Sequence, residues 1–287
     1  MLSYRHAFHA GNHADVLKHV ALVQMLDYLI QKPAPLYVID THAGAGRYRL
    51  DAREAQKLGE FREGIERIWD KQDAPKTVAA YLTAVREMNP AGELKQYPGS
   101  PWLAKRALRT SDRLRLFELH SNESRLLAQN FKGAGREVQT TAGDGLALLK
   151  SQIPPPSRRA LVLIDPSYET KADYANVLAA LKDALKRFAS GTYALWYPQL
   201  AKIKSRQLPE RLKRLPATGT DWLHVTLRVH APATDGVGMS GSGMFIINPP
   251  WTLADALRDS LPWLTEKLAQ DDTAEWKVET SADKTNQ

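Results

Sequence analysis

Short strand-like runs that each lead to a polar or small residue recur along this chain, and they constrain its fold more than any other feature. They lie at residues 35–39 before Asp40, 115–117 before Glu118, 138–141 before Gly143 and Asp144, 160–164 before Asp165, and 193–196 before Tyr197. Stretches with helical spacing separate them. This alternation predicts a doubly wound parallel sheet, in which a ligand binds at the carboxyl ends of the strands.

The run at 160–164 is followed by Asp165-Pro166-Ser167-Tyr168. A carboxylate and a proline carbonyl can together accept both hydrogens of an exocyclic amine, while an aromatic ring stacks on the base that carries the amine. The order of these residues therefore favours methyl transfer to the amino group of a nucleobase. By itself, the same tetrapeptide is also compatible with an ordinary Asp-Pro turn.

A second motif, Asp40-Thr41-His42-Ala43-Gly44-Ala45-Gly46, follows the run at 35–39. Glycines after a strand let the backbone pass close to a ligand, because glycine has no Cβ and tolerates positive φ. The dinucleotide fingerprint would need a further glycine where this chain has Arg49. An acidic residue followed by alternating glycines is instead typical of S-adenosylmethionine sites, although His42 stands where the first glycine is usual.

Together with the N-terminal block, these motifs resemble the large-subunit ribosomal RNA adenine-N6 methyltransferase J family of bacteria. The block comprises Met1-Leu2-Ser3-Tyr4-Arg5-His6 and Phe8-His9-Ala10-Gly11-Asn12-His13-Ala14-Asp15-Val16-Leu17-Lys18-His19, and it is the most specific part of the resemblance. The likeness runs nearly end to end. It implies transfer of a methyl group from S-adenosylmethionine to the N6 of one adenine in 23S ribosomal RNA.

The strand pattern also predicts the architecture. Residues 222–229 and 243–247 flank a glycine-rich connection and are expected to pair antiparallel after the parallel strands. A seven-stranded, mostly parallel sheet of this kind is the methyltransferase variant of the Rossmann-like α/β fold. We expect the methyltransferase domain at 1–50 and 99–270, with the N-terminal motif and an amphipathic helix within 1–31, a helical insertion at 51–98 and a flexible tail at 271–287.

Cofactor contacts are expected at the carboxyl ends of the strands. Glu118 is placed to accept hydrogen bonds from the ribose hydroxyls, and Gly143 and Asp144 to face the adenine. A solvated strand end or a helix cap is the alternative for Glu118 and Asp144. The glycine motif adds Asp40, Gly44 and Gly46 to the expected cofactor contacts, and the resemblance adds His19, His42 and Ser100. Asp165 completes the expected set.

The target amine is expected to meet Asp165 and the carbonyl of Pro166, with Asp165 accepting the released proton. Tyr168 would stack on the extruded adenine. The resemblance suggests that Tyr4, His6 and Lys18 line the adenine pocket, with Lys18 in the catalytic set. An N-terminal arm packed against the sheet is the alternative for His6.

A metal site is not expected, although histidines are frequent near the N-terminus. His9 and His13 stand four residues apart, but the glutamate of an H-E-x-x-H motif is absent and the chain has no cysteine. The absence of cysteine also excludes disulfides and fits a cytosolic protein. No apolar run approaches the roughly 20 residues of a membrane span. We therefore expect a cytoplasmic, monomeric protein that contacts no membrane.

Charge favours a polyanionic partner. The 287 residues include 39 Lys and Arg against 32 Asp and Glu, a formal net charge of +7. Lys202, Lys204 and Arg206 open one basic cluster, and a second spans 105–115. Either is expected to contact RNA phosphates, or to be only a solvated helix face.

Two other functions remain open from the sequence. One is methylation of adenine N6 in DNA, and the other is a basic RNA-binding module with a degenerate cofactor pocket, given His42 and Ser167. A second motif, Asn248-Pro249-Pro250-Trp251, is closer to the common N/D-P-P-aromatic form. It follows the last expected strand, however, where its prolines are expected to start the terminal helix.

Overall fold

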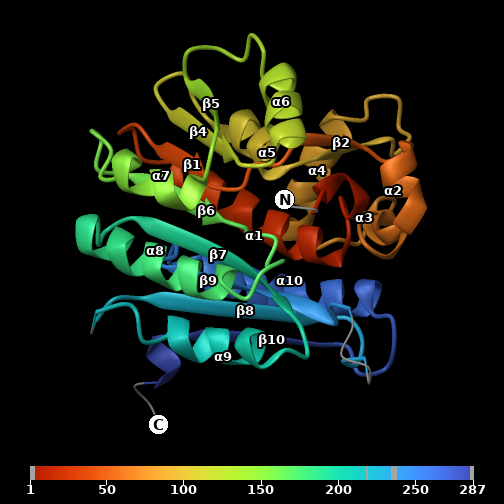
Figure 1. Ribbon diagram of the computed structural model, residues 1–287. Coiled ribbons are helices and arrows are strands. Elements are labelled where there is room, and N and C mark those ends of the chain that lie inside the picture. The colour runs from red at the N-terminus through yellow and green to blue at the C-terminus, as the bar shows by residue number, and fades with distance from the viewer. Residues whose placement is uncertain (1–3, 218, 234–237, 285–287) are drawn as a thin grey trace.

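The computed structural model describes residues 4–217, 219–233 and 238–284 (Figure 1). Met1, Leu2 and Ser3 of the N-terminal block, and residues 285–287 of the expected tail, lie outside the described residues.

The chain is built on one large sheet with helices on both faces (Figure 1). Its strand order is β10-β8-β9-β7-β6-β1-β4-β5. The strands are β1 (Tyr37–Asp40), β4 (Arg113–Glu118), β5 (Val138–Ala142), β6 (Ala160–Ile164), β7 (Thr192–Gln199), β8 (Trp222–Arg228), β9 (Gly241–Ile247) and β10 (Glu275–Thr280). The strands from β5 to β7 are parallel, and β9 runs antiparallel to both β7 and β8. The Rossmann-like α/β class predicted from the alternation is confirmed.

The expected count of seven strands is wrong, because the sheet has eight strands within the described ranges. The additional strand, β10, lies within the segment that was expected to be a flexible tail. It pairs antiparallel with β8 from Glu275 opposite Arg228 to Thr280 opposite Leu223, and the short helix η3 (Ala282–Lys284) follows it. The pairing satisfies backbone groups that β8 would otherwise leave open at the sheet edge. A polar edge strand of this kind has no apolar run by which the sequence could reveal it.

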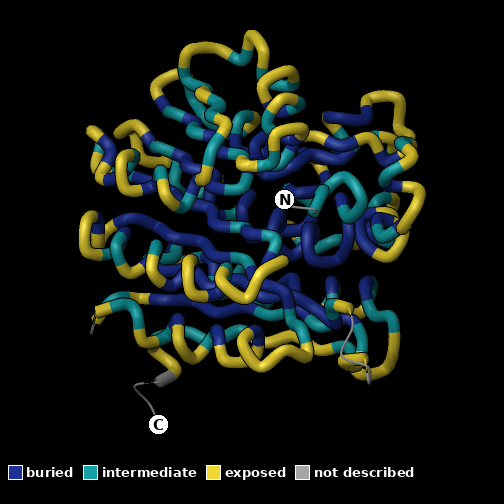
Figure 2. Tube along the Cα trace, viewed as in Figure 1, coloured by how far each residue is buried: buried dark blue, intermediate teal, exposed yellow. Residues whose placement is uncertain are grey.

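Helices cover the two faces of the sheet as two layers. One layer contains α1 (His13–Leu29), α4 (Lys76–Glu87), α5 (Ser100–Ala107), α6 (Ser121–Asn130) and α10 (Leu253–Leu268), and the other contains α7 (Gly145–Gln152), α8 (Asp173–Arg187) and α9 (Ile203–Leu212). Buried residues run through the centre of the molecule, and exposed ones lie on outer helices and loops (Figure 2). No helix in the described ranges is both long and apolar enough to cross a bilayer.

Helix α1 is not amphipathic, contrary to the sequence prediction. Every residue from His13 to Val23 is buried, because the helix lies between strand β9 and the helices α4, α5 and α10. The helix therefore carries several polar side chains into the interior. Such groups cost free energy unless they find partners, and their partners define the site described below.

The segment 51–98, expected as a helical insertion, consists of short elements that end in a strand. It contains α2 (Arg53–Leu58), η2 (Glu60–Glu63), α3 (Ile65–Ile68) and α4, then β3 (Gln96–Pro98), which pairs antiparallel with β2 (Arg47–Arg49). The pairing returns the chain to the glycine loop, where Gly99 donates its N–H to the carbonyl of Gly46 at 3.0 Å. This segment thus brings Ser100 beside the end of β1.

Candidate active site

A cavity of about 520 Å³ lies at the carboxyl ends of the parallel strands, as the alternation of strands and helices predicted. Of the residues predicted from the sequence, those that line it are Tyr4, His6, Lys18, His19, His42, Gly44, Ser100, Glu118, Asp144, Asp165 and Pro166. The short helix η1 (His6–Phe8) and helix α1 close the side that the sheet leaves open. The N-terminal block and the strand ends therefore form one site.

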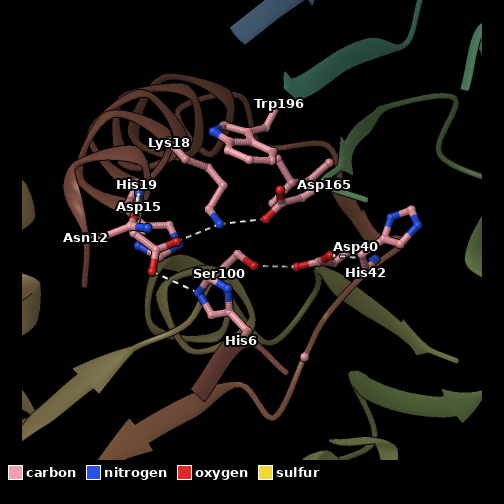
Figure 3. A network of polar contacts seen from close by, with 12 residues as sticks. His6, Asn12, Asp15, Lys18, His19, Asp40, His42, Ser100, Asp165 and Trp196 are labelled. Carbon is pink, nitrogen blue, oxygen red and sulfur yellow. Dashed lines mark hydrogen bonds and ion pairs between the residues drawn. The ribbon is translucent and has the colours of Figure 1, made fainter. Parts of the chain in front are cut away.

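Asp165 follows β6 and meets a buried lysine from α1 (Figure 3). Lys18 Nζ donates to Asp165 Oδ2 at 2.5 Å and lies 2.7 Å from Asp15 Oδ1. The Asp165 side chain is 14% exposed, whereas those of Lys18 and Asp15 are 5% and 1% exposed. Asp165 is thus the member of this trio that is most open to the cavity.

His6 and Tyr4 extend this network toward the N-terminus. His6 Nε2 lies 2.8 Å from Asp15 Oδ2, and its Nδ1 lies 2.8 Å from the Tyr4 hydroxyl. The Tyr4 ring stacks on His9 with 5.2 Å between the ring centroids. Asp15, which sequence reasoning did not single out, therefore holds both His6 and Lys18. The available signal was its i, i+3 spacing to Lys18 on one helix.

Asp40 lies just behind the cavity wall rather than in it. Ser100 Oγ donates to its Oδ2 at 2.7 Å, and the backbone N–H of His42 donates to its Oδ1 at 3.1 Å. Burial raises the pKa of Asp40 to about 7, although the Ser100 hydrogen bond opposes the shift. Asp40 thus fixes Ser100 and the start of the glycine loop.

Two histidines in the cavity wall are neutral at physiological pH. Burial lowers the pKa of His42 to about 4 and that of His19 to about 3. His42 Nδ1 lies 2.8 Å from the Thr41 hydroxyl, and His19 Nδ1 lies 2.8 Å from the Tyr97 hydroxyl. The buried Nε2 of His19 has no hydrogen-bond partner among the described residues. A ligand in the cavity is a natural partner for this polar atom.

The glycine loop requires glycine at Gly44. Its φ is +57°, and an added Cβ would lie 2.1 Å from the Tyr48 hydroxyl. Its N–H donates to Glu118 Oε2 at 2.8 Å, so the loop and the end of β4 hold each other. Burial raises the pKa of Glu118. Gly46 does not line the cavity, since its Cα faces the Phe131 ring of the neighbouring α6 turn.

Asp144 is both a cavity residue and a helix cap. Its Oδ1 accepts from the N–H groups of Leu146 and Ala147 at 2.9 and 3.1 Å and so begins α7. Gly143 lies outside the cavity lining and donates its N–H to the Glu118 carbonyl. The apolar side chains of Leu119 and Leu146 lie in the same wall. This end of the cavity offers carboxylates beside two apolar surfaces.

Tyr168 does not face the cavity. Its side chain is buried, its hydroxyl donates to the Trp196 carbonyl at 3.0 Å, and its ring lies 4.7 Å from that of Tyr174. Trp196 from β7 lines the cavity instead, with Lys18 Nζ 5.9 Å from its ring centroid. Sequence reasoning missed Trp196 because a tryptophan within a strand run has the pattern of a core residue.

The second motif lies away from this cavity. Asn248 donates from Nδ2 to the carbonyls of Ala189 and Gly191 at 2.7 and 2.8 Å, so its amide is engaged by the backbone. Trp251 is 77% exposed just before α10. The motif therefore terminates β9 and leads into the last long helix.

The two basic clusters differ in what surrounds them. Lys202, Lys204 and Arg206 are exposed at the start of α9, shortly after Leu200 in the cavity lining, and have no ion pair with a described residue. In the second cluster Lys105 pairs with Glu137, Arg106 with Glu87 and Arg109 with Asp112. The first cluster therefore lies beside the cavity without a carboxylate partner among the described residues, although Lys204 Nζ also donates to the Lys171 carbonyl at 3.0 Å.

Metal binding finds no support in the described part of the chain, where no group of three or more His, Asp or Glu side chains is arranged to hold an ion.

Known proteins identify the family. Residues 33–281 match the model of the family described as ribosomal RNA large subunit methyltransferase D, RlmJ. The chain belongs to this family. It is 45% identical over 281 residues to the ribosomal RNA large subunit methyltransferase J of Haemophilus influenzae, covering 97% of this chain and 98% of the relative. The Escherichia coli protein of the same name is 46% identical over 269 residues, which are 93% of this chain and 94% of that one.

A solved structure agrees over the same extent. The crystal structure of a Legionella pneumophila protein is 34% identical, covers 94% of this chain and 98% of its own, and superposes with a TM-score of 0.87. Family membership confirms the resemblance drawn from the N-terminal block and the two motifs. The chain is a methyltransferase, and S-adenosylmethionine is its cofactor.

Proposed function

We propose that this enzyme transfers a methyl group from S-adenosylmethionine to the N6 of an adenine in 23S ribosomal RNA. The observation that carries the proposal is the position of Asp165 and Pro166. They lie in the cavity at the end of β6, beside the Gly44 loop at the end of neighbouring β1. The relatives of this chain from Haemophilus influenzae and Escherichia coli are named as methyltransferases of large-subunit ribosomal RNA. Such a substrate places the activity in the cytoplasm.

The cavity has suitable groups for each part of the cofactor. Glu118 is available to the ribose hydroxyls, and Asp144 with Leu119 and Leu146 to the adenine. At the other end, Ser100 and the unpartnered Nε2 of His19 are available to the polar end of the methionine moiety. Bound there, the cofactor supplies an electrophilic methyl group on sulfur.

The protein must raise the reactivity of a poor nucleophile, because the N6 lone pair is delocalised into the adenine ring. Asp165 Oδ2 is engaged by Lys18, which leaves Oδ1 and the Pro166 carbonyl to accept the two amine hydrogens. These hydrogen bonds favour a pyramidal nitrogen and hold it in line for attack. Asp165 then accepts the proton, directly or through water, once methylation has made the amine acidic.

We assign the stacking of the target base to Tyr4 and Trp196, which both line the cavity near Lys18 and Asp165. We assign Tyr168 a supporting part, because its hydrogen bond to the Trp196 carbonyl fixes the strand that presents the indole. Stacking of a base on an aromatic side chain contributes about 1 to 3 kcal/mol. An adenine must leave its own stack to reach this depth.

Phosphate contacts are assigned to Lys202, Lys204 and Arg206, whose exposed cations continue from the cavity wall. Backbone contacts of this kind position the RNA, while the pocket selects the base.

Parallel substrates test the function. The purified enzyme is given S-adenosylmethionine with 23S ribosomal RNA, with 16S ribosomal RNA or with duplex DNA, and the nucleosides are analysed by mass spectrometry. We expect N6-methyladenosine in the 23S reaction alone. Methylation of the duplex instead would favour a DNA enzyme, and cofactor binding without any methylation would remove the assignment of Asp165. Calorimetry with no heat of cofactor binding would favour a non-catalytic RNA-binding module.

A further inference from the structure

We propose that Asp15 is a positioning residue for methyl transfer, acting on Asp165 through Lys18. Asp15 shares the Lys18 ammonium with Asp165. Asp165 therefore keeps one free oxygen and remains basic enough to accept a proton from the target amine. This inference rests on the proposed function, in which Asp165 receives the amine.

The geometry places one ammonium between two carboxylates. Lys18 Nζ is 2.7 Å from Asp15 Oδ1 and 2.5 Å from Asp165 Oδ2, and the side chains of Asp15 and Lys18 are at least nine-tenths buried (Figure 3). The trio carries a net charge of −1 when all three are ionised. Because Asp15 and Lys18 balance each other, the unbalanced negative charge belongs to the carboxylate that faces the cavity.

Asp15 is held so firmly that its orientation is set before a substrate arrives. Its Oδ2 accepts from the Gly11 N–H at 2.9 Å and contacts His6 Nε2 at 2.8 Å. Its own N–H is capped by Asn12 Oδ1 at 2.9 Å. Burial disfavours the charged form of Asp15, but His6 and Lys18 outweigh it and hold the pKa of Asp15 well below its ordinary range.

Lys18 is consequently fixed as an ammonium. Burial favours the neutral amine, but Asp15 and Asp165 together raise the pKa of Lys18 above its ordinary value. It therefore cannot take the proton that the methylated amine releases. Its contribution is to orient Asp165, and the strength of its attraction to Asp165 determines how well that carboxylate accepts a proton.

Removing Asp15 would change that attraction. Without Asp15, the Lys18 ammonium would interact with Asp165 alone. It would then compete with the target N–H groups for the Asp165 oxygens and make that carboxylate a weaker proton acceptor. Sharing the ammonium with Asp15 weakens both effects. The negative charge retained on Asp165 then stabilises the positive charge that develops on N6 during transfer.

The test compares Asp15→Asn, Lys18→Met and the double variant. We expect Asp15→Asn to lower kcat by about tenfold or more, with KM for S-adenosylmethionine within about threefold of wild type. The acidic limb of the pH profile of kcat/KM should shift to lower pH, because a buried negative charge beside the reacting groups is removed. Lys18→Met should shift the same limb to higher pH, since it removes the positive charge.

The other titratable groups that face Asp165 are common to all these variants. They are Tyr4 from the N-terminal segment, Asp40 and His42 from the β1 end, and Tyr168 from the β6 loop. Differences in the position of the limb therefore report the change at Asp15 or Lys18. The matched control is Asp27→Asn, an exposed carboxylate farther along α1, which should leave kcat and the profile unchanged.

The double variant separates positioning from a merely structural role. If Asp15 acts through Lys18, adding Asp15→Asn to Lys18→Met should cost less than about twofold. The proposal would be overturned if Asp15→Asn lowered kcat by the same factor in the wild-type and Lys18→Met backgrounds. It would also be overturned if Asp15→Asn lowered kcat without moving the acidic limb. If the Asp15→Asn variant does not fold, the Lys18→Met variant provides the test, because its acidic limb should shift to higher pH. The absence of that shift would also overturn the proposal. Failure of the proposed function would appear earlier, as wild-type enzyme that forms no N6-methyladenosine.

Discussion

At the scale of single residues, Asp165 is the side chain on which the chemistry depends. Replacing Asp165 by Ala should abolish turnover, while cofactor affinity stays within about tenfold, because the side chain acts on the target amine. The fold should tolerate the change, since Lys18 keeps Asp15 as a partner. Formation of N6-methyladenosine measures turnover, and calorimetry measures cofactor binding. Wild-type-like turnover by a folded variant would contradict the assignment.

Asp40 gives a prediction about stability and pH. Its pKa is raised from 3.8 to about 7 by burial, so the folded state binds a proton that the unfolded state releases. Its contribution to stability is therefore fully present below about pH 4 and is lost as pH rises through 7. Between pH 4 and 8 the cofactor-free wild type should lose about 4 kcal/mol of unfolding free energy relative to Asp40→Asn.

Urea unfolding of both proteins at several pH values measures this difference. Because each pH compares two proteins that share every other titrating group, the buried histidines cancel. A constant difference in unfolding free energy across this range would show that Asp40 titrates near its ordinary pKa in the folded protein.

At the scale of elements, helix α9 is expected to carry the RNA contacts. Replacing Lys202, Lys204 and Arg206 by Ala should weaken binding to target and non-target RNA alike. The slope of log affinity against log salt should become shallower by roughly 2 to 3, at about 0.7 to 0.9 for each phosphate that the protein no longer neutralises. Fluorescence anisotropy over a salt series measures the slope.

The control for α9 comes from α5. Lys105→Ala with Arg106→Ala removes two cations that are already paired with Glu137 and Glu87. Surface pairs of this kind contribute little, so folding should be retained, and the salt slope should hardly change. A larger change from the α5 variant than from the α9 variant would move the RNA surface to the 105–115 cluster.

At the scale of the whole molecule, cofactor binding should stabilise the entire domain, because the cavity joins α1 and the loop 41–44 to the ends of β4, β5 and β6. At a concentration 100 times its Kd, S-adenosylmethionine should add about 2.7 kcal/mol to the free energy of unfolding. Gly44→Val should remove this stabilisation, because its Cβ would lie 2.1 Å from the Tyr48 hydroxyl and distort the loop.

Gly133→Val is the matched control for Gly44. Gly133 also has a positive φ, +80°, but a Cβ there would meet no atom within 4 Å. Both variants carry backbone strain, and only the first also disturbs the site. Thermal unfolding with and without S-adenosylmethionine should therefore show a shift in Tm for the Gly133 variant and none for the Gly44 variant. An undiminished shift in the Gly44 variant would argue against the proposed glycine loop.

The pattern of residues along the chain was enough to predict where the parallel strands end. Asp40, Glu118, Asp144 and Asp165 each follow a strand-like run, and parallel strands bring their carboxyl ends to one edge. The wall opposite that edge depends on contacts between distant parts of the chain, which local periodicity does not encode. The Lys18–Asp165 contact spans 147 positions along the chain. Strand β10 pairs with β8 although its polar sequence contains no apolar run that would predict a strand.

Tertiary packing also decided which of the predicted side chains face the cavity. Helix α1 is covered on all sides from His13 to Val23, so the charges in that part must pair internally, and Asp15 becomes part of the site for that reason. Tyr168 turns into the core between Tyr174 and Trp196, and the indole takes its place in the cavity wall. A residue's position at a strand end follows from spacing along the chain. The direction of its side chain follows from which neighbours fill the space on either side.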